Sequence, residues 1–175
     1  VRAYAKKLDD FTGKKFELGK RDIKMAFSAV ESSDAGAIPA LKRAARNIRL
    51  FAEKQALQLK DFSFSLDGVS IGQKVIPLER VGCYVPGGRY PLPSSALMSI
   101  IPAKAAGVKE IVVCSPKIAP VVVVAAAIAG ADRIFSIGGI QAIGAMAYGT
   151  ESVPQVDKIV GPGNRFVAAA KREVY

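Results

Sequence analysis

Residues suited to acid-base or metal chemistry are sparse in this sequence. Its 175 residues include no histidine, so the commonest general base and a frequent zinc ligand are both missing. No pair of carboxylates and no Ser-Lys arrangement stands out as a substitute. Cys83 and Cys114 have no metal-ligand spacing and fall in apolar runs, where a cysteine is more often a small core residue than a nucleophile. The sequence therefore indicates a binding surface without a catalytic centre or a metal site.

Polar side chains beside glycine-rich turns are the stronger chemical signal. Tyr84 lies just before Pro-Gly-Gly, Gln141 follows Gly-Gly-Ile, and Asn164 ends Gly-Pro-Gly-Asn. An aromatic ring can lie against a base or ribose, and an amide offers a donor and an acceptor together. Glycine permits a ligand to approach the backbone, and a helix N-terminus favours an anion such as pyrophosphate. The alternatives stay open: Tyr84 as a core tyrosine, Gln141 as a surface amide and Asn164 as a helix N-cap.

These residues belong to a rhythm of strand, turn and helix that fills the second half of the chain. Short apolar β-rich runs alternate with helix-forming segments, which predicts right-handed βαβ units and a parallel sheet covered on both faces. The predicted strands are 80–85, 109–115, 132–137 and 156–160. The predicted helices are 94–106, 120–129, 140–148 and 164 onward, with Pro102 forcing a kink or a restart in the first.

A parallel sheet also predicts where a ligand binds. The carboxyl ends of its strands share one edge, where turns bring backbone N–H groups and helix N-termini together. This places Tyr84, Gln141 and Asn164 at one edge, with Ser94 and Ser95 as N-cap candidates first and substrate contacts second. No GxGxxG motif with a later acidic residue is present, so the spacing alone leaves nucleotide binding and ligand-free turns as equal alternatives.

The first part of the chain has a different pattern. Helical periodicity covers residues 1–11, 20–32 and 35–59, after which Phe62, Phe64 and Leu66 alternate with polar residues before Asp67-Gly68. Alternation around Asp-Gly predicts a β-hairpin. We therefore expect two parts, a helical segment plus hairpin over residues 1–80 and a βα-repeat domain over residues 81–175.

Charge and composition limit the function classes. More than half of the 25 Lys and Arg residues lie in the first 60 positions, where Lys42, Arg46 and Arg49 share one side of a predicted helix. This is typical of an amphipathic helix with a solvated basic face; a non-enzymatic phosphate or nucleic-acid binding module is the alternative. No apolar run is long enough to span a bilayer, and we expect no signal peptide. Two cysteines are too few for a disulfide framework, which favours a reducing, cytoplasmic setting.

Two long segments closely resemble histidinol dehydrogenase. They are "RVGCYVPGGRYPLPSSALMSIIPAKAAGVKEIVVCSP" and "SIGGIQAIGAMAYGTESVPQVDKIVGPGN". The resemblance implies a zinc-dependent homodimeric enzyme that oxidises L-histidinol to L-histidine through L-histidinal in two NAD-linked steps, with no nucleic-acid or membrane partner. It also implies an α/β fold of two incomplete Rossmann-like domains, the second of which begins near Tyr84.

The resemblance also assigns roles to individual residues. The family's NAD-contacting residues fall on Tyr84, Gln141 and Asn164, and a serine near the substrate and metal falls on Ser94. The family's Glu-His acid-base pair and its zinc ligands lie downstream of "GPGN". We therefore expect this sequence to be an internal fragment of the enzyme that is inactive by itself.

Overall fold

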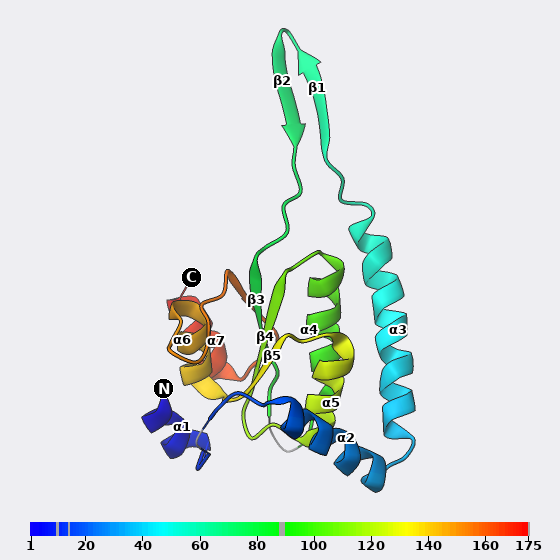
Figure 1. Ribbon diagram of the computed structural model, residues 1–175. Helices are drawn as coiled ribbons and strands as arrows, with labels where there is room; N and C mark the ends of the chain where they lie inside the picture. Colours follow the sequence, from blue (N-terminus) through cyan, green and yellow to red (C-terminus); the bar gives the residue numbers. More distant parts are fainter. Residues whose placement is uncertain (10, 14, 88–89, 175) are drawn as a thin grey trace.

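The computed structural model describes residues 1–9, 11–13, 15–87 and 90–174, and its centre is a four-stranded parallel sheet (Figure 1). The strand order is β5-β4-β3-β6. The strands are β3 (Arg80–Tyr84), β4 (Glu110–Ser115), β5 (Arg133–Ser136) and β6 (Lys158–Val160). The predicted α/β class and parallel sheet are therefore confirmed.

Helices cover both faces of this sheet. In Figure 1, α4 and α5 lie on one face with α2 and α3 packed outside them, and α6 and α7 lie on the other. The helices are α1 (Arg2–Asp9), α2 (Lys20–Ser33), α3 (Ala37–Ala56), α4 (Pro93–Ala105), α5 (Pro120–Ala129), α6 (Gly139–Tyr148) and α7 (Arg165–Glu173). Both faces are covered, so the residues inside the strands are apolar and the charged residues stand at the strand starts.

The two buried faces of the sheet belong to separate core clusters. Cys83 and Val113 pack with α4 and α5, whereas Tyr84 and Cys114 pack with α6 and Val167 of α7. Successive residues of a strand point to opposite faces, which explains why neighbours in the sequence enter different clusters. Burial raises the pKa of the Cys83 thiol to about 11 and also raises that of Cys114, so both thiols are protonated core residues at neutral pH.

The order of the strands reverses beside β3. The chain runs from β3 through β4 to β5 on one side, and then crosses by α6 to place β6 on the other side of β3. In open α/β sheets a ligand crevice forms at such a reversal, outside the carboxyl ends of the strands. The turns after β3 and β6 flank this point.

The first part of the chain packs onto the sheet domain. Ala26 and Val30 of α2 and Ala45 of α3 belong to the same core cluster as α4 and α5. Residues 16–18 also extend the sheet beside β5, where Leu18 N donates to Ile134 O at 2.8 Å and Ser136 N donates to Phe16 O at 2.8 Å. The predicted division at residue 80 stays a prediction, since shared packing does not test independent folding.

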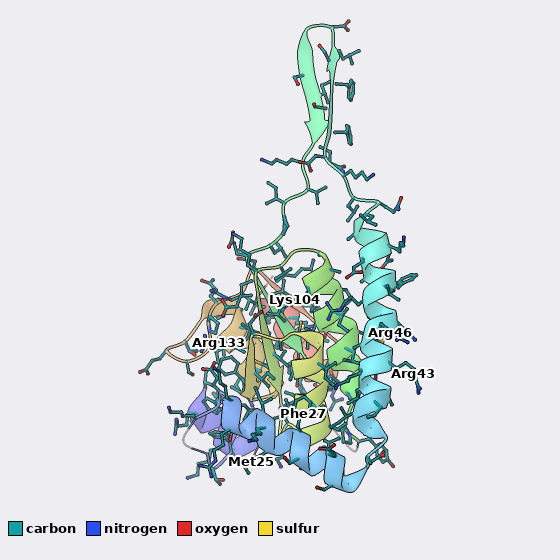
Figure 2. The ribbon with its side chains drawn as sticks, turned by 45° about the vertical axis from the view of Figure 1, so that its right-hand side comes forward. Met25, Phe27, Arg43, Arg46, Lys104 and Arg133 are labelled. Carbon is teal, nitrogen blue, oxygen red and sulfur yellow. The ribbon has the colours of Figure 1, made fainter. Side chains whose placement is uncertain are left out.

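The predicted hairpin is confirmed and projects away from the rest of the molecule (Figures 1 and 2). It consists of β1 (Phe62–Leu66) and β2 (Val69–Gln73), all ten residues of which are exposed. Asp67 and Gly68 both have positive φ, as a two-residue turn that matches the twist of the strands requires. The register puts Phe64 opposite Ile71 on one apolar face of the hairpin.

One prediction for α4 was wrong. The helix begins at Pro93, whose fixed φ and missing N–H suit the first helical position, so neither Ser94 nor Ser95 is the N-cap. The helix continues through Pro102 to Ala105, so of the two predicted effects of this proline the restart does not occur and the kink stays a prediction. None of the helices in the described part of the chain is both long and apolar enough to cross a membrane.

Candidate nucleotide-binding site

A pocket of about 580 Å³ opens at the carboxyl edge of the sheet. It is formed by the turns that follow β3, β4 and β6, the first turn of α6, and α1. Its described lining residues are Leu8, Tyr84, Pro86, Gly87, Tyr90, Pro91, Ser115, Pro116, Lys117, Ala119, Val122, Gly139, Ile140, Asn164 and Phe166. The volume lies in the range of small-molecule sites, and the position is the one predicted from the parallel sheet.

Tyr84 connects two of these turns. It is the last residue of β3 and is 4% exposed, and its hydroxyl accepts a hydrogen bond from the backbone N–H of Gly139 at 3.1 Å. The ring packs in the core beside α6 and also lines the pocket. Tyr84 is thus a core tyrosine whose position allows a ligand contact as well.

Gln141 lies in the first turn of α6 and is buried, with 6% exposure. The surface-amide alternative is therefore wrong. A Cβ atom placed on Gly139 would lie 2.8 Å from Gln141 Oε1, so the side chain folds back against the start of its own helix. It stands next to the lining residues Gly139 and Ile140 without lining the pocket itself.

Asn164 is the N-cap of α7 and lines the pocket as well. Its Oδ1 accepts hydrogen bonds from Phe166 N and Val167 N, both at 3.0 Å. The cap satisfies two of the backbone donors at the helix start and thereby fixes the side chain. With Oδ1 engaged, the amide nitrogen is the part of this side chain that can donate to a ligand.

The turn before Asn164 packs directly on the end of β3. Gly161 has a φ of +106°, and a Cβ atom there would lie 2.0 Å from Tyr84 O, so no other residue fits without a backbone shift. From α7, Lys171 Nζ donates to Gly161 O at 2.6 Å, and burial lowers the pKa of this lysine. These contacts keep the turn that carries Asn164 packed against the end of β3, next to Tyr84.

The first glycine of the Pro-Gly-Gly turn, Gly87, lines the pocket and also packs against a neighbouring turn. A Cβ atom on Gly87 would lie 2.7 Å from Pro116 O, so the missing side chain leaves room for the neighbouring turn. Gly88, the second glycine of this turn, lies outside the described residues. Gly87 therefore permits two turns at the pocket rim to pack together.

Sequence reasoning missed several residues of the pocket. Leu8 comes from α1, and its approach depends on tertiary packing with no local signal. Tyr90, Lys117 and Phe166 stand in or beside turns that the sequence placed at this edge, so their proximity to the turns was an available signal. Ser94 is exposed on α4 and does not line this pocket; its proximity to the substrate stays a prediction.

The lining chemistry fits a nucleotide. Three aromatic rings, those of Tyr84, Tyr90 and Phe166, offer surfaces for a base. The N-termini of α5, α6 and α7 also reach the pocket, and their backbone N–H groups favour phosphate. Zinc has no comparable site, because in the described ranges no three His, Cys, Asp or Glu side chains come together.

The fold and the pocket thus define an α/β protein with a candidate nucleotide site at the carboxyl edge of a parallel sheet. The chain belongs to the histidinol dehydrogenase family, since the family model described as histidinol dehydrogenase matches residues 1–175.

Individual relatives support this family assignment. Histidinol dehydrogenase from Methanosarcina mazei is 48% identical over 179 residues, which cover 99% of this chain and 41% of the relative. Its counterpart from Bacillus cereus is 51% identical over 176 residues, covering 98% and 40%. The crystal structure of histidinol dehydrogenase from Elizabethkingia anophelis superposes with a TM-score of 0.89 at 36% identity, over 98% of this chain and 40% of that one. The chain therefore spans about two fifths of the length of these relatives.

Proposed function

We propose that this chain supplies the NAD-contacting part of a histidinol dehydrogenase. The whole enzyme would oxidise L-histidinol to L-histidine through L-histidinal with two molecules of NAD. The observation that carries the proposal is the meeting of Tyr84 and Asn164 in one pocket, where the strand order of the sheet reverses. The two residues come from opposite ends of the βα-repeat and are the positions that the family resemblance assigns to NAD.

Three residues in and beside the pocket would each have a different role in binding NAD. Tyr84 would lay its ring against the dinucleotide while its hydroxyl holds the start of α6. Asn164 would donate from its amide nitrogen while its oxygen caps α7. Gln141 would keep the first turn of α6 in place from behind and reach the ligand after a local adjustment. NAD, when bound, supplies the hydride acceptor.

The acid-base and metal chemistry belongs to other parts of the enzyme under this proposal. The described residues offer zinc no ligand set, and the sequence has no histidine. We propose that zinc and the Glu-His pair are held in the portion of the family's polypeptide that these 175 residues do not cover. The whole enzyme would act as a cytoplasmic homodimer, and residues 1–175 alone would bind NAD weakly and turn over no histidinol.

A chimera tests this proposal. Residues 1–175 would replace the matching segment of the Methanosarcina mazei relative, which is 48% identical to them. We expect the chimera to reduce NAD in the presence of L-histidinol, and we expect no NADH from the 175-residue chain under the same conditions. A folded chimera without NAD reduction, or turnover by the 175 residues alone, would contradict the proposal.

A further inference from the structure

The last residue of β4, Ser115, is a buried serine with 1% exposure. In the described part of the chain, buried polar side chains stand at two positions, Ser115 and Gln141. Among the described residues, none donates a hydrogen bond to the Ser115 hydroxyl or accepts one from it. A buried polar group without a partner costs free energy, so such a group at a pocket indicates a bound ligand that completes it.

The fold directs Ser115 toward the pocket from the α5 side of the sheet. Val113, two positions earlier on the same strand, packs in the core with α4 and α5, and the alternation of a strand puts Ser115 on the same face. Val122, in the first turn of α5, belongs to that core cluster and also lines the pocket, as Ser115 itself does. The serine therefore lies where the pocket reaches between the end of β4 and the start of α5.

The start of α5 supplies further hydrogen-bond donors next to Ser115. The helix begins at Pro120, and its N-cap, Ala119, has no side chain that could accept a hydrogen bond. Val122 N donates to Ala119 O at 2.9 Å, whereas the N–H of Val121 has no acceptor among the described residues. An uncapped helix start attracts an acceptor that carries negative charge.

A serine hydroxyl and a helix start therefore meet in one part of the pocket, and both can donate to a phosphate oxygen. We propose that Ser115 Oγ and the start of α5 bind the diphosphate of the dinucleotide. This inference rests on the proposed function, because it adds a phosphate contact to the NAD site. Neither the sequence pattern nor the family resemblance assigned a role to Ser115.

The first test compares three ligands and three chains. NAD, ADP and adenosine are titrated into the unaltered 175-residue chain, Ser115→Ala and Ser136→Ala, and amide shifts in nuclear magnetic resonance spectra report binding down to weak affinity. Ser136 is the matched control, because it stands opposite Ser115 in the pairing of β4 with β5 and is not part of the described lining of the pocket.

We expect Ser115→Ala to weaken NAD and ADP about tenfold, as the loss of one hydrogen bond to a charged group predicts. The affinity for adenosine should change less than about twofold, because adenosine has no phosphate. Ser136→Ala should bind all three ligands as the unaltered chain does.

A second measurement separates ligand binding from a structural role. Ser115→Ala removes a polar group that is buried without a partner in the described chain, so the urea denaturation midpoint without ligand should stay the same or rise. A fixed concentration of NAD should then raise the midpoint less in Ser115→Ala than in the unaltered chain, because weaker binding gives less stabilisation.

The possible failures are distinguishable. Equal ADP affinity in the unaltered chain and in folded Ser115→Ala would overturn the role of Ser115 and leave the NAD site in place. An equal loss of adenosine and ADP affinity would overturn the phosphate contact. A lower midpoint of ligand-free Ser115→Ala would also overturn the inference, because the hydroxyl would then have a partner within the protein. The absence of NAD and ADP shifts in the unaltered chain would overturn both the inference and the proposed site.

Discussion

The Tyr84 hydroxyl accepts a hydrogen bond from the backbone N–H of Gly139 at 3.1 Å, which joins the end of β3 to the start of α6. The two residues are 55 positions apart in the sequence. The bond brings two turns of the candidate site into contact and orients the tyrosine ring at the pocket. Tyr84 therefore contributes both to the candidate site and to the local stability of the fold.

Replacing Tyr84 with phenylalanine should therefore affect both the candidate site and the stability of the fold. The ring stays in the core while the Gly139 N–H loses its acceptor, so we expect a loss of about 1 kcal/mol in the free energy of unfolding. Urea denaturation measures the change. Tyr148→Phe is the matched control, because Tyr148 is 71% exposed. An unchanged denaturation midpoint for Tyr84→Phe would show that this hydrogen bond contributes no net stability.

Two substitutions at Asn164 should separate its cap from its ligand contact. Asn164→Ala removes both, with an expected cost of about 1 kcal/mol in the free energy of unfolding. Asn164→Asp keeps an oxygen that accepts from Phe166 N and Val167 N, so stability should be retained. Its carboxylate should nevertheless weaken NAD binding, because it repels phosphate. Equal NAD affinity for Asn164→Asp and the unaltered chain would remove Asn164 from the proposed contacts.

The Glu17–Arg133 pair should make the free energy of unfolding depend on pH. Arg133 donates to both carboxylate oxygens of Glu17, each at 2.7 Å, and this hydrogen bonding lowers the pKa of Glu17. A lowered pKa means that the stabilisation is present at neutral pH and is lost as the pH falls through the lowered value. The pair is partly exposed, so Glu17→Gln should cost less than about 1 kcal/mol at neutral pH.

The measurement for this pair is a series of denaturation curves over pH. The difference in free energy of unfolding between the unaltered chain and Glu17→Gln should shrink as the solution becomes acidic. A difference that stays constant into strong acid would contradict the role assigned to the ionised carboxylate. Lys109→Gln, which breaks the surface pair with Glu79, provides the comparison for an ordinary exposed charge.

The basic surface of α3 should not bind nucleic acid. Figure 2 shows Arg43 and Arg46 pointing away from the body of the molecule, on a helix whose other side packs against α4. An amphipathic helix with such a solvated face accounts for these charges. We expect no shift of DNA or RNA by the chain in gels at moderate salt. Tight binding that weakens steeply with added salt would instead favour the nucleic-acid alternative.

The parts of the fold that local patterns determine could be predicted from the sequence. The four parallel strands follow from short apolar runs between turns, and the hairpin follows from the alternation around Asp67-Gly68. The bridge between Glu17 and Phe135 has no such signal, because it joins segments far apart in the chain. Pro93 explains the error at Ser94 and Ser95, since proline took the first helical position and moved the cap to Leu92.

The candidate site could also be predicted in part. The parallel sheet alone placed Tyr84 and Asn164 at one edge, and the pocket contains both. Burial of Gln141 depends on how the first turn of α6 folds against Gly139, which no pattern in the sequence encodes. The position of Lys117 depends on a positive φ at a residue that ordinarily avoids it.

The most direct test of the central claim is a titration of the 175-residue chain with NAD, followed by amide shifts in nuclear magnetic resonance spectra. The proposed site predicts that the affected amides cluster at the starts of α6 and α7, including those of Gly139, Ile140 and Phe166, with an affinity weaker than micromolar. A second pocket lies between α4 and β6 and is lined by Met98 and Val160 among others. Shifts that gather there instead would contradict a nucleotide site at the carboxyl edge.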